Sequence, residues 1–205
     1  TLSGASLGSS HADLDFNSRT TRLRYDTPVI AGFMASVSHS DGQEVEAALR
    51  YSGTLFDTRI RAGIGAAFNS LEGDAVTEMY GAQASFRHSS GIGVTGGCAV
   101  QHNEALTSVG TTTLQDDDPA GCVIQGHFQR KFNELGTSSL LVEYDQKDNM
   151  EASGDTAVGI GVTLHQAIDA AAMEVWFKYS NFELDRDGTD TDDVDVFTIG
   201  SRMRF

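Results

Sequence analysis

The amino-acid sequence alternates apolar and polar residues with a period of two over long stretches. One face of residues 157–165 carries Val158, Ile160, Val162 and Leu164, and the positions between them are mostly glycine, alanine and threonine. Successive side chains of a β-strand point to opposite faces, so this period indicates strands with one wet face and one apolar face. No stretch shows a convincing helical period.

The same period, followed along the whole chain, predicts about eleven strands, most of them 10–14 residues long. Globular strands are commonly about 5–6 residues long, whereas a tilted strand of about 9–11 residues crosses a bilayer. The length therefore favours a transmembrane sheet. The expected strands lie near 19–26, 30–40, 43–53, 55–68, 76–88, 91–103, 119–132, 137–147, 154–165, 169–183 and 193–205.

The connections between these strands alternate between short turns and longer polar loops. Short turns such as "NELGTS" separate loops such as "NSLEGDAVTE" and "DRDGTDTDDVD", and "SDGQE" is the weakest of the expected loops. Turns at one end and loops at the other are typical of an up-and-down outer-membrane β-barrel. A water-soluble sandwich or extracellular adhesin would also alternate, since antiparallel sheets often have one solvated face. Its strands would usually be shorter and more aliphatic.

Composition narrows the class of protein further. The formal net charge is −15, which argues against nucleic acid as a partner because phosphate binding needs a basic surface. The sequence contains no run of about 18–20 apolar residues, so it predicts no transmembrane helix. The chain has no initiator methionine and no signal peptide, so we expect a processed or incomplete product.

Residues 11–41, "HADLDFNSRTTRLRYDTPVIAGFMASVSHSD", resemble a landmark of the Gram-negative general porins. In that family a polar "DLD…SR" segment closes the constriction loop, an "R-x-R-Y-D-[ST]-P" strand descends to a tight turn, and a "GF" strand returns. The segments "VEAALRYSG" and "TRIRAGIGAAF" also resemble strands of this family, and the resemblance extends over essentially the whole chain. The ending "SRMRF" resembles the signal that the barrel-assembly machinery recognises, with Phe205 as its final aromatic.

This resemblance implies an all-β, transmembrane, antiparallel up-and-down barrel of sixteen strands, of which the chain supplies the last eleven. Residues 1–18 are then the end of the constriction loop, and residues 19–205 are the barrel strands with short periplasmic turns and longer external loops. An odd number of strands does not close an ordinary bacterial barrel, so we expect the remaining strands from a preceding segment. The implied assembly is a homotrimer in the bacterial outer membrane, in contact with lipid and lipopolysaccharide.

Charged residues on the wet faces are the candidates for a pore constriction. A basic wall opposite an acidic loop sets a filter for size and charge in a narrow aqueous pore. The alternative is that these charges are solvated and paired along neighbouring strands. The expected constriction residues are Asp13 and Asp15 on the loop, with Arg22, Arg24, Arg50, Arg59 and Arg61 on the wall.

The two cysteines, Cys98 and Cys122, are symmetric about Gly110 in the middle of one long loop. Simple hairpin pairing places them opposite each other on the apolar face. A cross-strand disulfide needs a Cα separation of about 4.4–6.8 Å. The alternative is a pair of buried free thiols.

The acidic stretch "DRDGTDTDD" invites a calcium interpretation, because hard cations bind several carboxylate oxygens. It lacks the register and terminal glutamate of an EF-hand, so the competing interpretation is a solvated external loop. Weak Ca²⁺ binding, bridging to lipopolysaccharide phosphates, is the metal hypothesis, and no other cofactor is expected. The candidate ligands are Asp187, Asp190, Asp192 and Asp193.

The function expected from these features is passive transport of small hydrophilic solutes through a water-filled channel. No reaction is expected, because the six histidines lie in six different segments without a nucleophile motif. A barrel that acts as a sheath or a surface anchor is the structural alternative, and an outer-membrane hydrolase is the enzymatic one. The five tyrosines all fall on the apolar face, where interfacial aromatic belts are expected.

Overall fold

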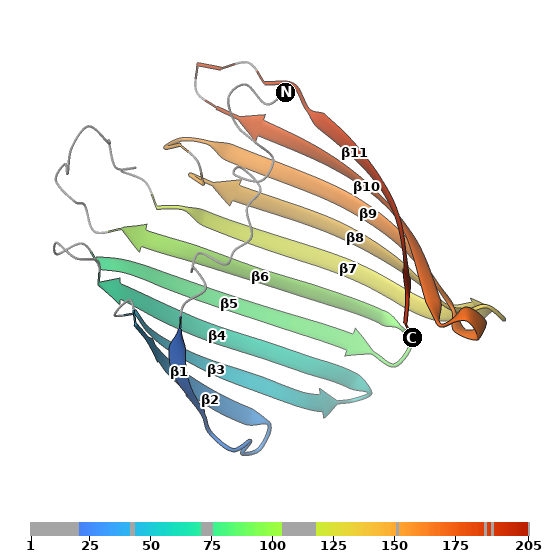
Figure 1. The fold of residues 1–205 in the computed structure, drawn as a ribbon, viewed down its shortest axis with the longest axis horizontal. Helices are drawn as coiled ribbons and strands as arrows, with labels where there is room; N and C mark the ends of the chain where they lie inside the picture. The colour runs from blue at the N-terminus through green and yellow to red at the C-terminus, as the bar shows by residue number, and fades with distance from the viewer. Residues whose placement is uncertain are drawn as a thin grey trace.

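A computed structural model shows one curved sheet of eleven antiparallel strands (Figure 1). The structure describes residues 21–41, 44–70, 76–103, 118–150, 152–186, 188–189 and 191–204. The expected all-β, up-and-down architecture is confirmed, and the eleven strands match the expected ones to within a few residues. The strands are β1 Arg22–Asp26, β2 Phe33–Ser40, β3 Glu44–Leu55, β4 Thr58–Ser70, β5 Val76–His88, β6 Ile92–Asn103, β7 Ala120–Asn133, β8 Gly136–Asp148, β9 Thr156–Ile168, β10 Met173–Asp185 and β11 Val194–Met203.

Every strand pairs with the next one along the chain, so the sheet is a meander in sequence order. The register is regular apart from one irregularity in β7, between Arg130 and Asn133. Because the order of pairing is linear, β1 and β11 are the two edges, and the described strands do not close into a ring. Figure 1 shows the central strands β4–β8 running along nearly the same line, with β1 and β11 at steeper angles at the two edges.

The turns follow from local backbone preferences. Phe56 and Asp57, which link β3 to β4, both have positive φ angles (45° and 59°), as a two-residue type I′ hairpin turn requires. A single 3₁₀ turn, Asp169–Ala171, links β9 to β10. The connection between β2 and β3 has three residues, 41–43, close to the two that the expected strands 30–40 and 43–53 leave between them.

The sheet has no conventional hydrophobic core in its described part, where Ala67, Ala157 and Leu184 are the buried apolar residues. Large apolar side chains are instead exposed along one face, with Leu23 82% and Ile199 84% exposed. A second packed layer normally covers such a face in a water-soluble protein. None of the described residues forms a helix long and apolar enough to cross a membrane.

Candidate functional site: the polar face of the sheet

The polar face of the sheet lines a hollow of about 1240 Å³ that extends from β2 to β8. The polar side chains of this face come from alternate positions of each strand, so the pairing register arranges them in rows across the sheet. One such row runs from Ser52 through Arg61, Ser85, Thr95 and Gln125 to Glu143. The rows join an arginine-rich part, on β1 and β3–β5, to a carboxylate-containing part on β8.

The first two arginines of this face are neutralised by carboxylates. Arg22 donates to Glu46 at 2.8 Å, and Arg24 reaches Asp26 at 2.8 Å. The hydroxyl of Ser38 also donates to Glu46, at 2.6 Å. These pairs are partly exposed, so they orient the side chains more than they stabilise the fold.

Four further arginines lie together on the adjoining strands, and we call Arg50, Arg59, Arg61 and Arg87 the arginine patch. Arg59 of β4 is directly opposite Arg87 of β5, and Arg61 is two residues further along β4. Arg50 of β3 faces Gly63, the next position on the same side of β4. Two of these arginines bond to neutral side chains: Arg50 donates to Ser36 at 2.5 Å, and Arg87 donates to Gln129.

The far side of the polar face carries paired charges on β8 and β10. Lys147 lies 3.3 Å from Asp145, and Lys178 lies 3.4 Å from Glu143. Asp145 is almost buried, and a Cβ at its neighbour Gly159 would overlap the Asp145 carboxylate. The glycine therefore makes room for a carboxylate on the wall.

The two ends of the polar face have ion pairs of their own. Near the turns, Glu174 accepts from Arg202 and lies 2.8 Å from His165 Nε2. At the loop end, Arg186 binds Asp155 through two nitrogens, with its Nε 2.9 Å from Oδ1. Because Asp155 follows β8 and Arg186 follows β10, this pair connects two loops.

The five wall arginines expected at a constriction all lie on the polar face, but at different levels. Arg24 is level with Glu46, because both pair with Ser38, whereas Arg50 is four residues further along β3. That offset is about 13 Å at the usual rise of a strand. The expected acidic partners Asp13 and Asp15 lie outside the described residues.

Lys147 and Gln125 are polar-face residues that the sequence interpretation missed. Lys147 has the same parity as Glu143 and Asp145 in "VEYDQKD", so strict alternation alone would have found it. Gln125 donates to Glu143, a contact that depends on the register between β7 and β8. The alternation of residues within one strand does not specify how that strand is aligned with its neighbour.

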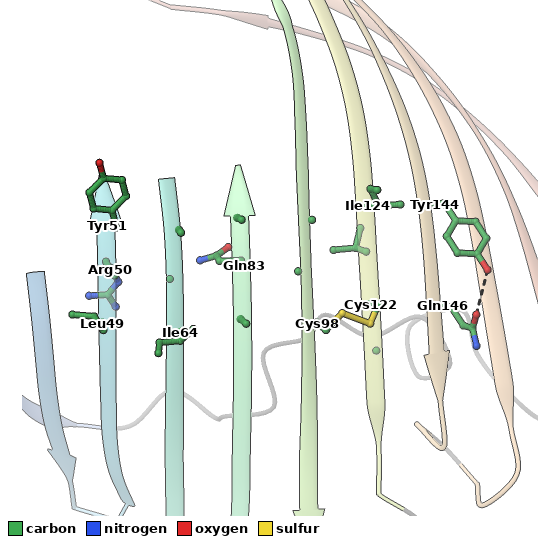
Figure 2. A pocket seen from close by; sticks show the side chains of 18 of the residues that line it. Leu49, Arg50, Tyr51, Ile64, Gln83, Cys98, Cys122, Ile124, Tyr144 and Gln146 are labelled. Atoms are coloured by element: carbon green, nitrogen blue, oxygen red, sulfur yellow. Dashed lines mark hydrogen bonds between the residues drawn. A yellow bond between two sulfur atoms is a disulfide. The ribbon is translucent and has the colours of Figure 1, made fainter. Parts of the chain in front are cut away.

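The structure joins Cys98 and Cys122 in a disulfide on the apolar face of β6 and β7 (Figure 2). The two residues are directly opposite, with Cα atoms 4.1 Å apart, slightly closer than the expected range of about 4.4–6.8 Å. The amide of Gln101 donates to the carbonyl of Pro119 in the same ladder, which makes the Cys98–Cys122 pair, three positions away, a non-hydrogen-bonded pair. Side chains approach most closely at such pairs.

Small residues surround this disulfide. Ala82, Ala84 and Gly96 lie between Ile64 on one side and Ile124 on the other, and they line a shallow hollow of about 860 Å³. Figure 2 shows the disulfide joining β6 to β7, with Ile124 next to it along β7 and the Tyr144 hydroxyl directed at Gln146. This hollow adjoins the larger one, because residues such as Arg50 and Gln83 line both.

The proposed calcium ligands are only partly visible. Asp187 and Asp190 lie outside the described residues, whereas Asp192 and Asp193 are exposed in the connection before β11. In the part of the chain that the structure describes, no group of three or more ligating side chains comes together. Phe205 also lies outside the described residues, and the last strand that precedes it presents Phe197, Ile199 and Met203 on its apolar face.

Aromatic residues collect near both ends of the apolar face. Phe33 packs on Tyr51 at the turn end, with ring centroids 4.8 Å apart. At the loop end Phe68 packs on Tyr80 at 6.0 Å, and the Tyr80 hydroxyl donates to Glu78 at 2.6 Å. Tyrosine and phenylalanine in two belts are typical of the water interfaces of a membrane barrel.

Long strands in one meander, a charged face around a hollow and an exposed apolar face with two aromatic belts together define a porin-type β-barrel sheet. No family model matches the chain, and no curated protein sequence is significantly similar to it. Similarity appears among solved structures.

Two crystal structures of OpdO (OccK3) from Pseudomonas aeruginosa align with the chain at TM-scores of 0.63 and 0.65 and 14% identity. They cover 88% of this chain, which spans 56% and 55% of theirs. An anion-selective porin from Comamonas acidovorans aligns at a TM-score of 0.66 and 13% identity, over 90% of this chain and 59% of that one. The chain thus has the fold of these proteins and spans just over half of their length.

Proposed function

We propose that the chain forms the wall of a passive, water-filled pore for small hydrophilic solutes in a bacterial outer membrane. The observation that carries the proposal is the division of one single-layer sheet into a charged face around a hollow and an exposed apolar face. An apolar face of this kind is stable in contact with lipid. The charged face then lines water, as in the lumen of a porin.

The competing water-soluble sandwich needs two sheets with their apolar faces packed together. All eleven described strands belong to one sheet, and their apolar side chains have no covering layer among the described residues. The aromatic residues at both ends of the apolar face add further support for a bilayer of limited thickness between two interfaces.

The implied partners belong to the same proposal. The resemblance of residues 11–41 to general porins supports a homotrimer, assembly by the barrel-assembly machinery and contact with lipopolysaccharide. Chemical crosslinking of the purified protein in mild detergent tests the assembly. A ladder that stops at three subunits supports the trimer, whereas a single subunit band at every crosslinker concentration contradicts it.

Single-channel recording in planar lipid bilayers tests the pore itself. Purified protein should produce discrete steps of conductance that grow in proportion to bulk salt conductivity, because ions cross a water-filled lumen. A preparation that is folded, as judged by heat-dependent migration in gels, and yet gives no steps would contradict the pore. A barrel blocked by a bound partner, as in the sheath alternative, would give steps only after that partner is removed.

A further inference from the structure

We propose that Trp176 forms a binding platform for sugar rings on the polar face of the sheet. The inference rests on the proposed function, because a solute reaches this face through a water-filled lumen, and it adds a solute class and a binding site. We call Trp176, His165, Glu174 and Arg202 the tryptophan site. Trp176 is the fourth residue of β10, so the site lies near the turn end of that strand.

Trp176 lies on the opposite face from the neighbouring aromatic residues of β10. Phe177 and Tyr179 pack against Phe197 on the apolar face, with ring centroids 6.3 and 5.1 Å apart. Successive side chains of a strand point to opposite faces, so Trp176 is directed to the polar face together with Glu174. Its position is therefore not that of the interfacial tryptophans that contact lipid in a membrane barrel.

The indole ring lies over the neighbouring strand, β11. Trp176 is directly opposite Gly200 in the β10–β11 ladder, and a Cβ at Gly200 would overlap Cζ2 and Cε2 of the indole. The ring therefore occupies the space above the glycine that any other residue would fill with its own side chain. Trp176 is half-buried, so the wall holds the ring while part of its surface stays open.

Charged groups beside the ring hold one another in place. Glu174, two residues from Trp176 on β10, accepts from Arg202 and lies 2.8 Å from His165 Nε2 and 3.5 Å from Arg204. His165 is directly opposite Trp176 on β9. The side chains of Arg202 and Arg204 are 59% and 71% exposed. Since a guanidinium has five N–H donors, it can bind one carboxylate and still donate to a ligand.

A second row of hydrogen-bonding side chains lies on the other side of the ring, toward the loop end. Lys178, two residues beyond Trp176 on β10, is directly opposite Thr163 of β9 and Thr198 of β11. Each threonine hydroxyl can both donate and accept. The indole surface thus lies between two rows of hydrogen-bonding groups, one on each side along the strands.

A sugar ring has the two kinds of surface that this arrangement fits. Its C–H groups form an apolar face, which leaves water when it packs on an aromatic ring. The hydroxyl groups at its edge hydrogen-bond to charged side chains, which are stronger partners than neutral ones. A solute without an apolar face gains nothing from the indole, and a solute without hydroxyl groups leaves the neighbouring charged groups without compensation.

Tryptophan fluorescence of the folded protein tests the site directly, because Trp176 is the only tryptophan among the 205 residues. The protein is held in a detergent without a sugar headgroup and titrated with methyl β-glucoside, whose ring does not open. The emission should change and reach saturation. Sorbitol, an open-chain compound with similar hydroxyl groups, should give no saturable change, because it has no rigid apolar face.

Matched variants separate binding from folding, with affinity for methyl β-glucoside measured by isothermal titration calorimetry. Trp176→Ala should weaken binding about tenfold, the order expected when an aromatic contact is lost, and Trp176→Phe should retain part of it. Phe177→Leu, which changes the neighbouring aromatic residue on the apolar face, should leave the affinity within about twofold. Heat-dependent gel migration identifies any variant that does not fold, and Trp176→Phe with Arg202→Gln then carries the test.

Three results would overturn the proposal: no saturable response of the unsubstituted protein, an equal response to sorbitol, or equal affinity in the Trp176 and Phe177 variants. Conductance recordings on the same samples distinguish this proposal from the pore. Channels that conduct normally, from protein that does not bind methyl β-glucoside, would refute the tryptophan site and leave the pore intact. Sugar binding by a folded protein without conductance would refute the pore alone.

Discussion

Asp155 is a charged residue that the fold almost completely buries, at 3% exposure. Its partner Arg186 donates to it from Nε at 2.9 Å and from a second nitrogen. Removing one member of a buried pair is costly because the other remains desolvated. Asp155→Asn should therefore lower the free energy of unfolding by about 3 kcal/mol.

Urea unfolding in detergent, followed by tryptophan fluorescence, measures this change. Asp192→Asn is the matched control, because Asp192 is exposed in the same loop region. Equal stability of the two variants would show that the Asp155–Arg186 pair contributes nothing measurable.

The Cys98–Cys122 disulfide leads to a testable expectation about the number of free thiols. Titration with Ellman's reagent in denaturant should find no free thiol before reduction and two afterwards. Two free thiols in the unreduced protein would contradict the bond. Replacing both cysteines with serine should lower stability by about 2–4 kcal/mol, because the bond restricts the unfolded chain.

Each strand presents one apolar face and one polar face, and neighbouring residues of β7 allow the surroundings of the two faces to be compared. Ile124 lies on the apolar face and is 53% exposed, whereas the adjacent Gln125 reaches Glu143 on the polar face. Ile124→Lys should destabilise the protein by about 2–4 kcal/mol if the apolar face contacts lipid near the bilayer middle. Gln125→Lys should be nearly neutral, since it places a cation beside a carboxylate.

Urea unfolding in lipid vesicles is the measurement for this pair of variants. Similar stability of the two lysine variants would be inconsistent with lipid on the Ile124 side. The two substitutions are neighbours in one strand and introduce the same residue, and the strand propensity lost with isoleucine accounts for at most about 1 kcal/mol of a difference between them.

The strands were predictable because their length and alternation are local properties. "TAVGIGVTLHQ" and "VEAALRYSG" reveal which side of β9 and β3 is wet without knowledge of their neighbours. The pairing of Arg22 with Glu46 and the opposition of Arg59 and Arg87 were not predictable in the same way, since they depend on register between strands. A shift of the pairing register by one residue would move each side chain of a strand to the other face and give it different cross-strand partners.

On the scale of the whole molecule, the chain is strongly acidic, yet part of its polar face is basic. The charge near a pore, more than the total charge, governs which ions enter it. Reversing Arg22 and Arg24 together to glutamate changes the wall by four charge units. The reversal potential under a salt gradient should then shift toward cation preference, most strongly in dilute salt, where screening is weakest.

Planar-bilayer recording measures this shift, with Arg130→Glu as a control on an exposed residue near the turn end of β7. An unchanged reversal potential in the Arg22→Glu/Arg24→Glu protein would remove both residues from the ion filter. A shift of the same size in the control would assign the effect to general surface charge.

The bond between β6 and β7 also changes the covalent topology of the sheet. Cys98 and Cys122 are separated by 24 positions in the sequence, so the disulfide closes that stretch into a ring that includes residues 104–117. A protease that cut the backbone within this ring would leave β1–β6 and β7–β11 as one molecule. The chain could thus be cut between β6 and β7 and still hold both groups of strands together until a reductant separates them.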